Sequence, residues 1–339
     1  MQIKRKATSI AVIGAGISGL TAAQTLSDAG IDVTVFEKSR GVGGRTANRR
    51  SEYGSFDHGA QYFTVKDKRF RNFTEDLVSK GVVASWSNPD APSSPKVVYL
   101  KNGKICRSSV SNEKYVGTPA MNSICKHLSD GIEIVFNARV LKVSERSGKL
   151  SLRFQDDDKA LEYDGVIIST PSLQAAALIE EWPTLSKALG VIEMHPCWAC
   201  LATFRNPLTA HWVGAFLEDS HIGWIGRNST KPDRNSNTED LVIHATTEWS
   251  RANIAASRDV VSEILLEELW SKTGLNKQPS IYLNSHLWRY AIAARELNVE
   301  CLNATSSNLV ICGDWAHGSR IEGAFLSGLS ASNKMLQKL

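Results

Sequence analysis

The sequence predicts an α/β fold into which a second domain, built on a mostly antiparallel sheet, is inserted. Residues 8–37 read as an apolar strand, a glycine-rich turn, a helix and a second strand that ends in an acid. From residue 182 to about 284 the composition shifts to short strand-like runs, and an apolar strand and helix then close the chain. A chain of 339 residues is long enough for two such domains.

The glycine-rich turn has the spacing of a dinucleotide-binding βαβ unit. Gly14, Gly16 and Gly19 follow the first strand, and Glu37 ends the second. In a Rossmann-like unit these glycines permit the tight turn, the approach of a pyrophosphate and close helix packing, while the acid accepts ribose hydroxyls. The start of the helix adds free N–H groups and a positive dipole end. The alternative is a glycine turn in an ordinary α/β sheet.

Composition narrows the possible partners. The net charge of +4, without a basic stripe interleaved with aromatic residues, argues against nucleic acid. No apolar run reaches 18 residues, so we expect no membrane span. The basic residues 4–6 precede an apolar stretch as in a secretory signal, but the glycines that follow break that stretch. We therefore expect a cytoplasmic protein.

The six cysteines do not form a metal-ligand pattern. Cys197 and Cys200 fit the CxxC formula, but they lie in an apolar, strand-like run. Residues three apart on a strand point to opposite faces. We expect buried, inert thiols rather than a redox or zinc pair, and no metal site.

The loop after the second strand, residues 38–50, contains the sequence GVGGR. Gly44 supplies flexibility, and Arg45 is placed to reach the pyrophosphate from the side opposite the first turn, unless the loop is merely a solvated basic segment. In the sequence FDHGAQYF that follows, Gly59 and Ala60 are small enough for a flat ring to lie on the backbone, and Tyr62 could face a substrate.

Hydrophobic periodicity predicts the remaining elements. We expect helices over 67–81, 117–129 and 173–181, a hairpin over 97–107, and a buried strand at 166–169 that rejoins the parallel sheet. Four short strands between 132 and 163 predict an antiparallel meander. In the inserted block we expect strands at 199–204, 212–216, 223–227 and 241–246, and a helix over 260–273 that ends at Gly274.

Three side chains in the later part of the chain have two interpretations each. His244 lies in a predicted strand and is either a hydrogen-bonded core histidine or a substrate ligand. Trp288 and Tyr290 alternate as on a strand, so they share one face, in the core or in a site. Arg289 then points the other way.

The end of the chain again has the features of a ligand site. A buried strand at 309–312 leads into Gly313 and Asp314, where the acid can bind sugar hydroxyls. The sequence Glu322-Gly323-Ala324 opens an apolar helix. The positive end of that helix would stabilise negative charge on a ligand.

These segments resemble the flavin-containing amine oxidase superfamily. GAGISG, GVGGR and CGDW…EGA…SG carry the likeness, which covers the whole chain. Within the superfamily the chain is similar to bacterial renalases, through DHGAQYFT, IGRNSTKP, IHATTEWSR, WRYA and RIEGAFLSG.

The resemblance implies a Rossmann-like domain over residues 1–75, 130–175 and 290–339 that binds FAD non-covalently. It implies an α+β substrate domain over 76–129 and 176–289, in an amine oxidase-like architecture with the substrate pocket over the flavin ring. The helix start near Gly323 would then stabilise reduced flavin by about 0.5–2 kcal/mol. The residues expected to bind FAD are Gly14, Gly16, Ile17, Ser18, Gly19, Glu37, Lys38, Gly44, Arg45, Gly59, Ala60, Gln61, Tyr62, Val140, Gly313, Asp314, Glu322, Gly323 and Ala324.

Renalase-like enzymes return 2- or 6-dihydroNAD(P) to NAD(P)⁺ and pass the electrons to dioxygen, which yields hydrogen peroxide. A dihydropyridine donates hydride unaided, so the site needs aromatic surfaces and orientation rather than a strong base. The absence of a second strand–GxGxxG–helix unit also favours dioxygen as the acceptor. The alternatives are an oxidase of small amines and a flavin-bearing binding protein without turnover. We expect Tyr62, His244, Trp288 and Tyr290 to be catalytic, and Tyr62, Phe63, Thr64, Lys66, His244 and Trp288 to bind substrate.

Overall fold

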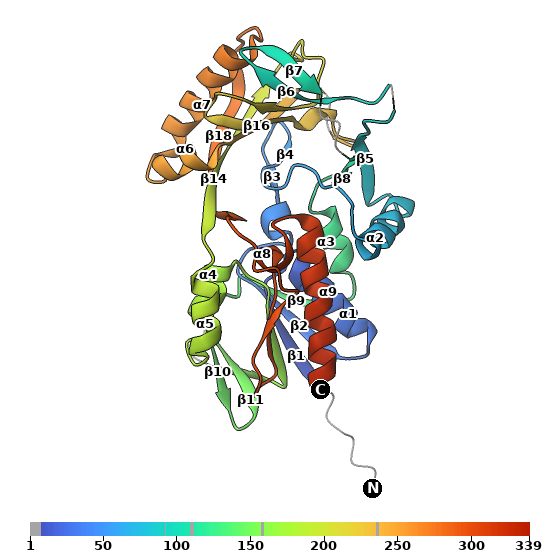
Figure 1. Cartoon of the computed structure of the whole chain (residues 1–339), viewed down its shortest axis with the longest axis vertical. Helices are drawn as coiled ribbons and strands as arrows, with labels where there is room; N and C mark the ends of the chain where they lie inside the picture. The colour runs from blue at the N-terminus through green and yellow to red at the C-terminus, as the bar shows by residue number, and fades with distance from the viewer. Residues whose placement is uncertain (1–7, 92, 109–111, 157–158, 235–236) are drawn as a thin grey trace. The chain divides into compact units, whose positions relative to one another are not determined.

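A computed structural model describes residues 8–91, 93–108, 112–156, 159–234 and 237–339 (Figure 1). The chain forms two compact units, each assembled from separate stretches of sequence. Unit 1 consists of Met1–Gly44, Ile124–Met194 and Ile292–Leu339, and unit 2 of Arg45–Ser123 and His195–Ala291.

Unit 1 is built on a six-stranded sheet in the order β19-β20-β13-β1-β2-β9. The strands from β20 to β9 pair in parallel, and the edge strand β19 is antiparallel to β20. Their apolar side chains form a core on both faces of the sheet, as expected for parallel strands. The strands are β1 (Ser9–Ile13), β2 (Asp32–Glu37), β9 (Glu133–Phe136), β13 (Gly165–Ile168), β19 (Leu302–Asn303) and β20 (Leu309–Ile311).

Helix α9 (Ile321–Lys338) packs along α1 (Ile17–Asp28), as Figure 1 shows. The two helices approach closely at Gly328, where an added Cβ would overlap the carbonyl oxygen of Ser18. This contact holds α9 against the first turn of α1. The N-termini of both helices therefore belong to unit 1. The other helices of unit 1 are α3 (Ser123–Leu128, whose first residue belongs to unit 2), α4 (Ser172–Leu178), α5 (Pro183–Gly190) and α8 (Asp314–His317).

Three expectations were wrong in detail. The helix expected over 117–129 spans only Ser123–Leu128, because Lys114–Gly117 form a strand instead. The predicted four-stranded meander has three strands, because β9 pairs in parallel with β2 instead. The predicted helix over 173–181 ends at Leu178, and α5, which begins at Pro183, was not expected. Proline at the first position of a helix is favourable because it lacks the N–H that would be unpaired there. The meander strands are β10 (Val140–Arg146), β11 (Lys149–Phe154) and β12 (Leu161–Tyr163).

Unit 2 is built on a seven-stranded sheet in the order β18-β14-β17-β16-β15-β6-β7. The pairs β14–β17, β17–β16, β16–β15 and β6–β7 are antiparallel, whereas β15 and β6 pair in parallel. Helix α7 (Arg258–Thr273) covers the sheet with Val261, Leu265 and Leu269, and it ends at Gly274 with φ 68°. The strands are β6 (Val97–Lys101), β7 (Lys104–Ser108), β14 (Met194–Phe204, whose first residue belongs to unit 1), β15 (Gly214–Leu217), β16 (Ile222–Arg227), β17 (Glu239–Ala245) and β18 (Ser280–Ala293, whose last two residues belong to unit 1).

The fold class predicted from the sequence is therefore confirmed, but four stretches (45–75, 124–129, 176–194 and 290–291) group differently from the expected domain boundaries. Residues 45–75 belong to unit 2, because the hydrogen bonds of this stretch go largely to other parts of unit 2. Residues 176–194 belong to unit 1, where α4 packs on β10 and α5. The remaining elements of unit 2 are η1 (Gly44–Thr46, which begins in unit 1), β3 (Asn48–Arg50), β4 (Ser55–Asp57), α2 (Lys68–Ser79), β5 (Val83–Ser87), β8 (Lys114–Gly117), η2 (Asn228–Thr230) and α6 (Thr247–Ala252).

Among the described residues, none of the helices combines the length and the apolar character that crossing a membrane requires.

Candidate functional site

The turn between β1 and α1 forms a cradle for a phosphate. Gly14 has φ 107°, and a Cβ there would lie 2.9 Å from Ser169 Oγ. At Gly19 a Cβ would overlap the carbonyl oxygen of Gly14, so the first turn of α1 packs directly on the glycine turn. A Cβ on Gly16 would meet nothing within 4 Å. The turn is therefore closed on its inner side and open at Gly16, next to the free N–H groups of a 12-residue helix.

The acid at the end of β2 braces this turn. Glu37 is buried, and its Oε2 accepts a hydrogen bond from Ala15 N at 2.9 Å, while its Oε1 accepts one from Ser39 N at 2.8 Å. The glycine loop that follows returns to the same place, since Gly43 N donates to the carbonyl oxygen of Ala15 at 2.9 Å. Two segments separated in sequence thus converge on the phosphate cradle.

The closing segment of unit 1 supplies a second helix start. Gly313 N donates to Ser327 Oγ at 3.0 Å, which holds the end of β20 on α9, and Asp314 is buried just beyond. A Cβ on Gly323 would overlap the carbonyl oxygen of Gly318, so only glycine fits at this position in the first turn of α9. Val140, at the start of β10, is also buried in unit 1.

In unit 2 the backbone carbonyl oxygen of His58 forms hydrogen bonds with the side chains of two predicted site residues. His244 Nε2 and Trp288 Nε1 each lie 3.0 Å from this oxygen. The oxygen can only accept, so Nε2 of His244 carries a proton and its Nδ1 is left as an acceptor. The ring of His286 packs against the rings of His58 and Trp288, with centroid distances of 5.0 Å and 4.5 Å. Sequence reasoning missed His58 and His286, although His286 shares the period-2 face of Trp288 and Tyr290.

A buried ion cluster anchors the start of this loop. Asp57 Oδ2 accepts from Lys231 Nζ at 3.1 Å and from Arg234 Nη2 at 2.7 Å, and all three side chains are at most 2% exposed. Asp57 Oδ1 accepts from Met121 N at 2.9 Å and from Asn48 Nδ2 at 3.0 Å. The two cations hold the pKa of Asp57 well below its usual range despite its burial. The backbone from Asp57 into His58 is thereby fixed.

Four side chains of unit 2 form what we call the aromatic cluster: Tyr62, Trp86, Phe216 and Trp224. The centroid of Trp224 lies 5.4 Å from that of Tyr62 and 4.7 Å from that of Phe216. Trp224 fits because Gly214 has no side chain, since a Cβ there would overlap the indole ring. Gln61 donates through Nε2 to the backbone carbonyl of Asp57. Among the described residues, Gln61 Oε1 and Trp224 Nε1 are buried without a hydrogen-bond partner, so each fits a hydrogen bond to a polar group of a ligand.

Comparison with family models decides the class of this chain. Residues 102–336 match the model described as flavin containing amine oxidoreductase, and residues 12–77 match an NAD(P)-binding Rossmann-like domain. The chain belongs to the flavin containing amine oxidoreductase family. It is a flavin-dependent oxidoreductase, and its cofactor is FAD.

Solved structures of similar fold include other flavin oxidoreductases. A putative protoporphyrinogen oxidase from Exiguobacterium sp. 255-15 has a TM-score of 0.77 at 11% identity, covering 98% of this chain and 100% of that one. A putrescine oxidase variant has a TM-score of 0.77 at 13% identity, covering 98% and 99% of the two chains. Cyclohexylamine oxidase from Brevibacterium oxydans IH-35A has a TM-score of 0.74 at 12% identity, with the same coverage. At such identities the likeness shows the fold alone.

Curated relatives match over a short segment. The 4,4'-diapophytoene desaturase of Staphylococcus haemolyticus is 38% identical over 76 residues, which cover 20% of this chain and 15% of the desaturase. The corresponding Staphylococcus aureus enzyme is 43% identical over 58 residues, 17% of this chain and 12% of that protein. These matches span less than a fifth of the relatives' length, so the relatives' reaction does not carry over to this family member.

The residues of unit 1 fit an FAD. The open face at Gly16 and the start of α1 would take the pyrophosphate, and Glu37 lies where a ribose would be held. Lys38 lies at the rim, with Nζ 3.1 Å from Gln174 Oε1. The start of α9 at Glu322–Ala324 would face the electron-rich part of the flavin.

Three histidines of unit 2 are held neutral. Burial lowers the pKa values of His58, His244 and His286 to about 4, and nearby cations add to the effect. Between pH 6.5 and 4 the unfolded chain therefore takes up protons that the folded chain refuses. Asp240, whose pKa burial raises to about 6, acts in the opposite direction but is a single group.

We predict that stability is lost as the pH falls from about 6.5 to 4. The unfolding midpoint of the FAD-loaded enzyme should be about 5 °C lower at pH 5 than at pH 7.5. His286→Asn should reduce this difference, because one of the three groups no longer titrates. A midpoint that stays flat or rises on acidification would contradict the assignment.

The structure shows where the other predicted side chains of unit 2 lie. Phe63 packs in the core, because its ring lies 5.7 Å from Tyr115 and 5.6 Å from Phe70 and it is 4% exposed. Its contact with substrate stays a prediction. Arg45 donates through Nη1 to the backbone carbonyl of Ala291 at 3.0 Å. Lys66 is exposed and Thr64 half-buried, while on β18 Arg289 is exposed and Tyr290 half-buried.

Gly59 and the two cysteines of the CxxC sequence are closely packed in unit 2. Gly59 is required where it stands, because a Cβ would overlap the carbonyl oxygen of Arg45, which also accepts from Ala60 N at 2.9 Å. Burial raises the pKa of Cys197 and of Cys200 to about 12, as expected for inert thiols.

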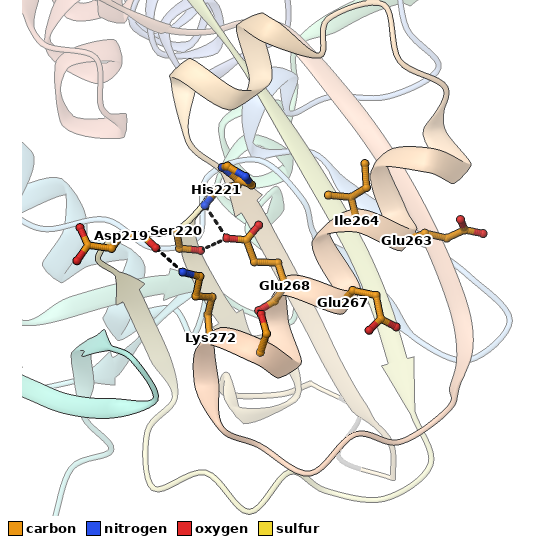
Figure 2. Close-up of a pocket in the computed structure, with 9 residues that line it drawn as sticks. Asp219, Ser220, His221, Glu263, Ile264, Glu267, Glu268 and Lys272 are labelled. Atoms are coloured by element: carbon orange, nitrogen blue, oxygen red, sulfur yellow. Dashed lines mark hydrogen bonds between the residues drawn. The ribbon is translucent and has the colours of Figure 1, made fainter.

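A hollow of about 830 Å³ beside α7 is a structural feature rather than the site (Figure 2). Glu268 Oε1 accepts from Ser220 Oγ and from His221 N, both at 2.7 Å, and Lys272 Nζ donates to the carbonyl oxygen of Asp219 at 2.7 Å. These bonds, drawn as dashes in Figure 2, staple the β15–β16 turn to α7. Glu263 and Glu267 add negative charge, and no predicted site residue lines the hollow.

Proposed function

We propose that this family member oxidises isomeric dihydronicotinamide dinucleotides, the 2- and 6-dihydro forms of NAD(P), back to NAD(P)⁺, a renalase-type activity. When bound, FAD would supply the hydride acceptor, and dioxygen would take up the electrons as hydrogen peroxide, the second product. The proposal rests on the segments shared with renalases and on one structural observation, the charge around the aromatic cluster.

The aromatic cluster already carries cations from the chain itself. Lys114 Nζ lies 5.6 Å from the ring centroid of Tyr62, and Lys231 Nζ lies 5.4 Å from that of Trp86. Burial lowers the pKa of Lys231 to about 8, so it is mostly charged at pH 7. The carboxylate of Asp57 is shared between Lys231 and Arg234. A protonated amine approaching these rings would meet like charge, whereas an anionic dinucleotide would be attracted.

His244 is suited to orient the substrate rather than to remove a proton. Its pKa of about 4 keeps the imidazole neutral, and the bond from Nε2 to the His58 carbonyl leaves Nδ1 as an acceptor. A carboxamide N–H₂ is the donor that a dihydronicotinamide offers to such an acceptor. Trp288, fixed by the same carbonyl, offers an aromatic face for the flat ring.

We predict that His244→Ala slows reduction of the flavin by 6-dihydroNAD about 10- to 100-fold, since an orienting hydrogen bond is lost. The FAD content of the variant should equal that of the wild-type protein. His221→Ala, at an exposed position of unit 2, is the matched control and should react normally. An unchanged rate in the His244 variant would return this residue to a purely structural role.

Anaerobic spectra test the proposed substrate class. The FAD-loaded protein is mixed without air with 2-dihydroNAD, 6-dihydroNAD, putrescine or cyclohexylamine, and the flavin absorbance near 450 nm is followed. We expect either dihydronucleotide to bleach the flavin and the amines to leave it oxidised. Bleaching by an amine alone would instead establish an amine oxidase, like the putrescine and cyclohexylamine oxidases of similar fold.

A further inference from the structure

Two of the six cysteines of the chain lie on neighbouring segments of unit 1. Leu302 of β19 pairs with Ile311 of β20 in an antiparallel register. One step further along the same two segments, this register places Cys301 opposite Cys312. Both are free thiols in the structure.

The backbone hydrogen bonds show which kind of cross-strand pair the two cysteines form. Ala304 N donates to the carbonyl oxygen of Leu309 at 3.0 Å, so these two are a hydrogen-bonded pair. Hydrogen-bonded and non-hydrogen-bonded pairs alternate along antiparallel strands, which makes Cys301 and Cys312 a non-hydrogen-bonded pair. Cys312 N accordingly donates away from Cys301, to the carbonyl oxygen of Ile168 in β13, at 2.9 Å. The Cα atoms of such a pair are about 4.5 Å apart, within the roughly 4.4–6.8 Å that a disulfide bond spans.

The two segments stay together beyond the cysteines. The Ser327 hydroxyl donates to the carbonyl oxygen of Glu300 at 2.7 Å and accepts from Gly313 N at 3.0 Å. One side chain of α9 thus joins the residue before Cys301 to the residue after Cys312. The register at the two cysteines is therefore held on both sides.

Both thiols lie on the side of the strands that faces the helices. Ser18 Oγ of α1 donates to Cys312 Sγ at 3.1 Å, and Cys301 has a hydrogen bond with the side chain of Ser330 in α9. Burial raises the pKa of Cys312 to about 12, and the neighbouring Cys301 adds to the effect. Cys301 is half-buried and Cys312 is fully buried, so a small solute reaches Cys301 first.

The cysteines of the CxxC sequence lack this arrangement. Cys197 Sγ lies 3.7 Å from the carbonyl oxygen of Ala245 in β17, whereas Cys200 Sγ lies 3.9 Å from that of Ser262 in α7. Residues three apart on a strand point to opposite faces, so these two thiols do not meet.

We infer that Cys301 and Cys312 form a reversible disulfide when the protein meets hydrogen peroxide. The Cys301 thiolate attacks one peroxide oxygen, the O–O bond breaks, and a sulfenic acid forms while hydroxide leaves. Cys312 then attacks the sulfenic sulfur, the S–O bond breaks, and the S–S bond forms as water leaves with the Cys312 proton. In total, two thiols lose two electrons and two protons, and one peroxide becomes two molecules of water. The inference does not depend on the proposed function, because peroxide from any source suffices.

Peptide mapping without reductant tests the inference on the FAD-loaded protein. Reduced wild-type protein is treated with hydrogen peroxide, the remaining thiols are alkylated, and the peptides are analysed by mass. We expect a pair of peptides joined through Cys301 and Cys312, about 2 Da lighter than the two reduced peptides together. The rate of joining should rise about 10-fold per unit of pH between pH 7 and 8.5, because burial raises the pKa of Cys301 and the thiolate is the form that reacts.

Three variants identify the role of each thiol. Cys312→Ser should let Cys301 proceed to the sulfinic acid, a gain of about 32 Da, because no thiol is left to trap the sulfenic acid. Cys301→Ser should leave the buried Cys312 reduced. Cys106→Ser removes an exposed thiol of β7 in unit 2 and is the control, with the same yield of joined peptides as wild type.

Two results would overturn the inference. One is sulfinic acid at Cys301 of the wild-type protein without the joined peptides, which would show that Cys312 does not reach the oxidised sulfur. The other is joining that occurs only after unfolding in urea, which would show that the native register keeps the two thiols apart. The wild-type measurement decides between these outcomes even if a serine variant fails to fold.

Discussion

Replacing Gly19 by alanine is expected to leave the protein without bound FAD. A Cβ at this position would overlap the carbonyl oxygen of Gly14 and crowd Ser169, whose Oγ in turn donates to the Ile13 and Gly14 carbonyls. Alanine is the better helix former by about 1 kcal/mol. The overlap is with backbone, however, and such overpacking costs about 3 kcal/mol. The net effect of the substitution is therefore destabilising.

Gly16→Ala is the matched control, because this position has φ −87° and open space around the added Cβ. The control should fold with a normal unfolding midpoint and bind FAD more weakly, since the methyl group stands where the pyrophosphate approaches. The flavin-to-protein absorbance ratio and the unfolding midpoint of both variants check this. A Gly19 variant with full FAD content would show that the turn is not the cofactor site.

Replacing Asp57 by asparagine should destabilise the protein by about 3–5 kcal/mol, because Lys231 and Arg234 would be left buried without a countercharge. The loss is a large fraction of the total stability of about 5–15 kcal/mol that is usual for a folded protein. The His58 carbonyl, which holds His244 and Trp288, would lose its anchor at the same time.

Urea unfolding of the Asp57 variant against Asp67→Asn checks this effect. Asp67 caps α2 and pairs with Arg69 at 3.0 Å on the surface, and asparagine caps helices about as well. The control should change the free energy of unfolding by less than about 0.5 kcal/mol. Equal changes in the free energy of unfolding for the two substitutions would mean that the buried ion cluster contributes no more to stability than the surface ion pair.

The elements that local sequence determines were predictable. The β1–α1–β2 unit, the cap of α2 at Asp67, and the end of α7 at Gly274 each depend on a turn or a periodic face contained in about 30 residues. The convergence of the glycine loop on the first turn followed from the same reasoning, because the backbone chemistry of a phosphate site demands it.

The parts that depend on distant partners were not predictable. Strand β9 has the same alternation whether it joins a meander or pairs with β2, and only the three-dimensional sheet decides. The pairing of Asp57 with Lys231 spans 174 residues, and the sequence around either residue contains no pattern that predicts it. Phe63 likewise sits in a motif of ligand-facing residues, yet it packs on Tyr115 through a β-bridge from another strand.

The stoichiometry of the aerobic reaction is the most direct test of the central claim. The FAD-loaded enzyme is given a limiting amount of 6-dihydroNAD in air-saturated buffer, and NAD⁺ and hydrogen peroxide are both quantified. One mole of each per mole of substrate is the predicted result. Recovery of unchanged 6-dihydroNAD, alongside peroxide formed from an amine under the same conditions, would contradict it.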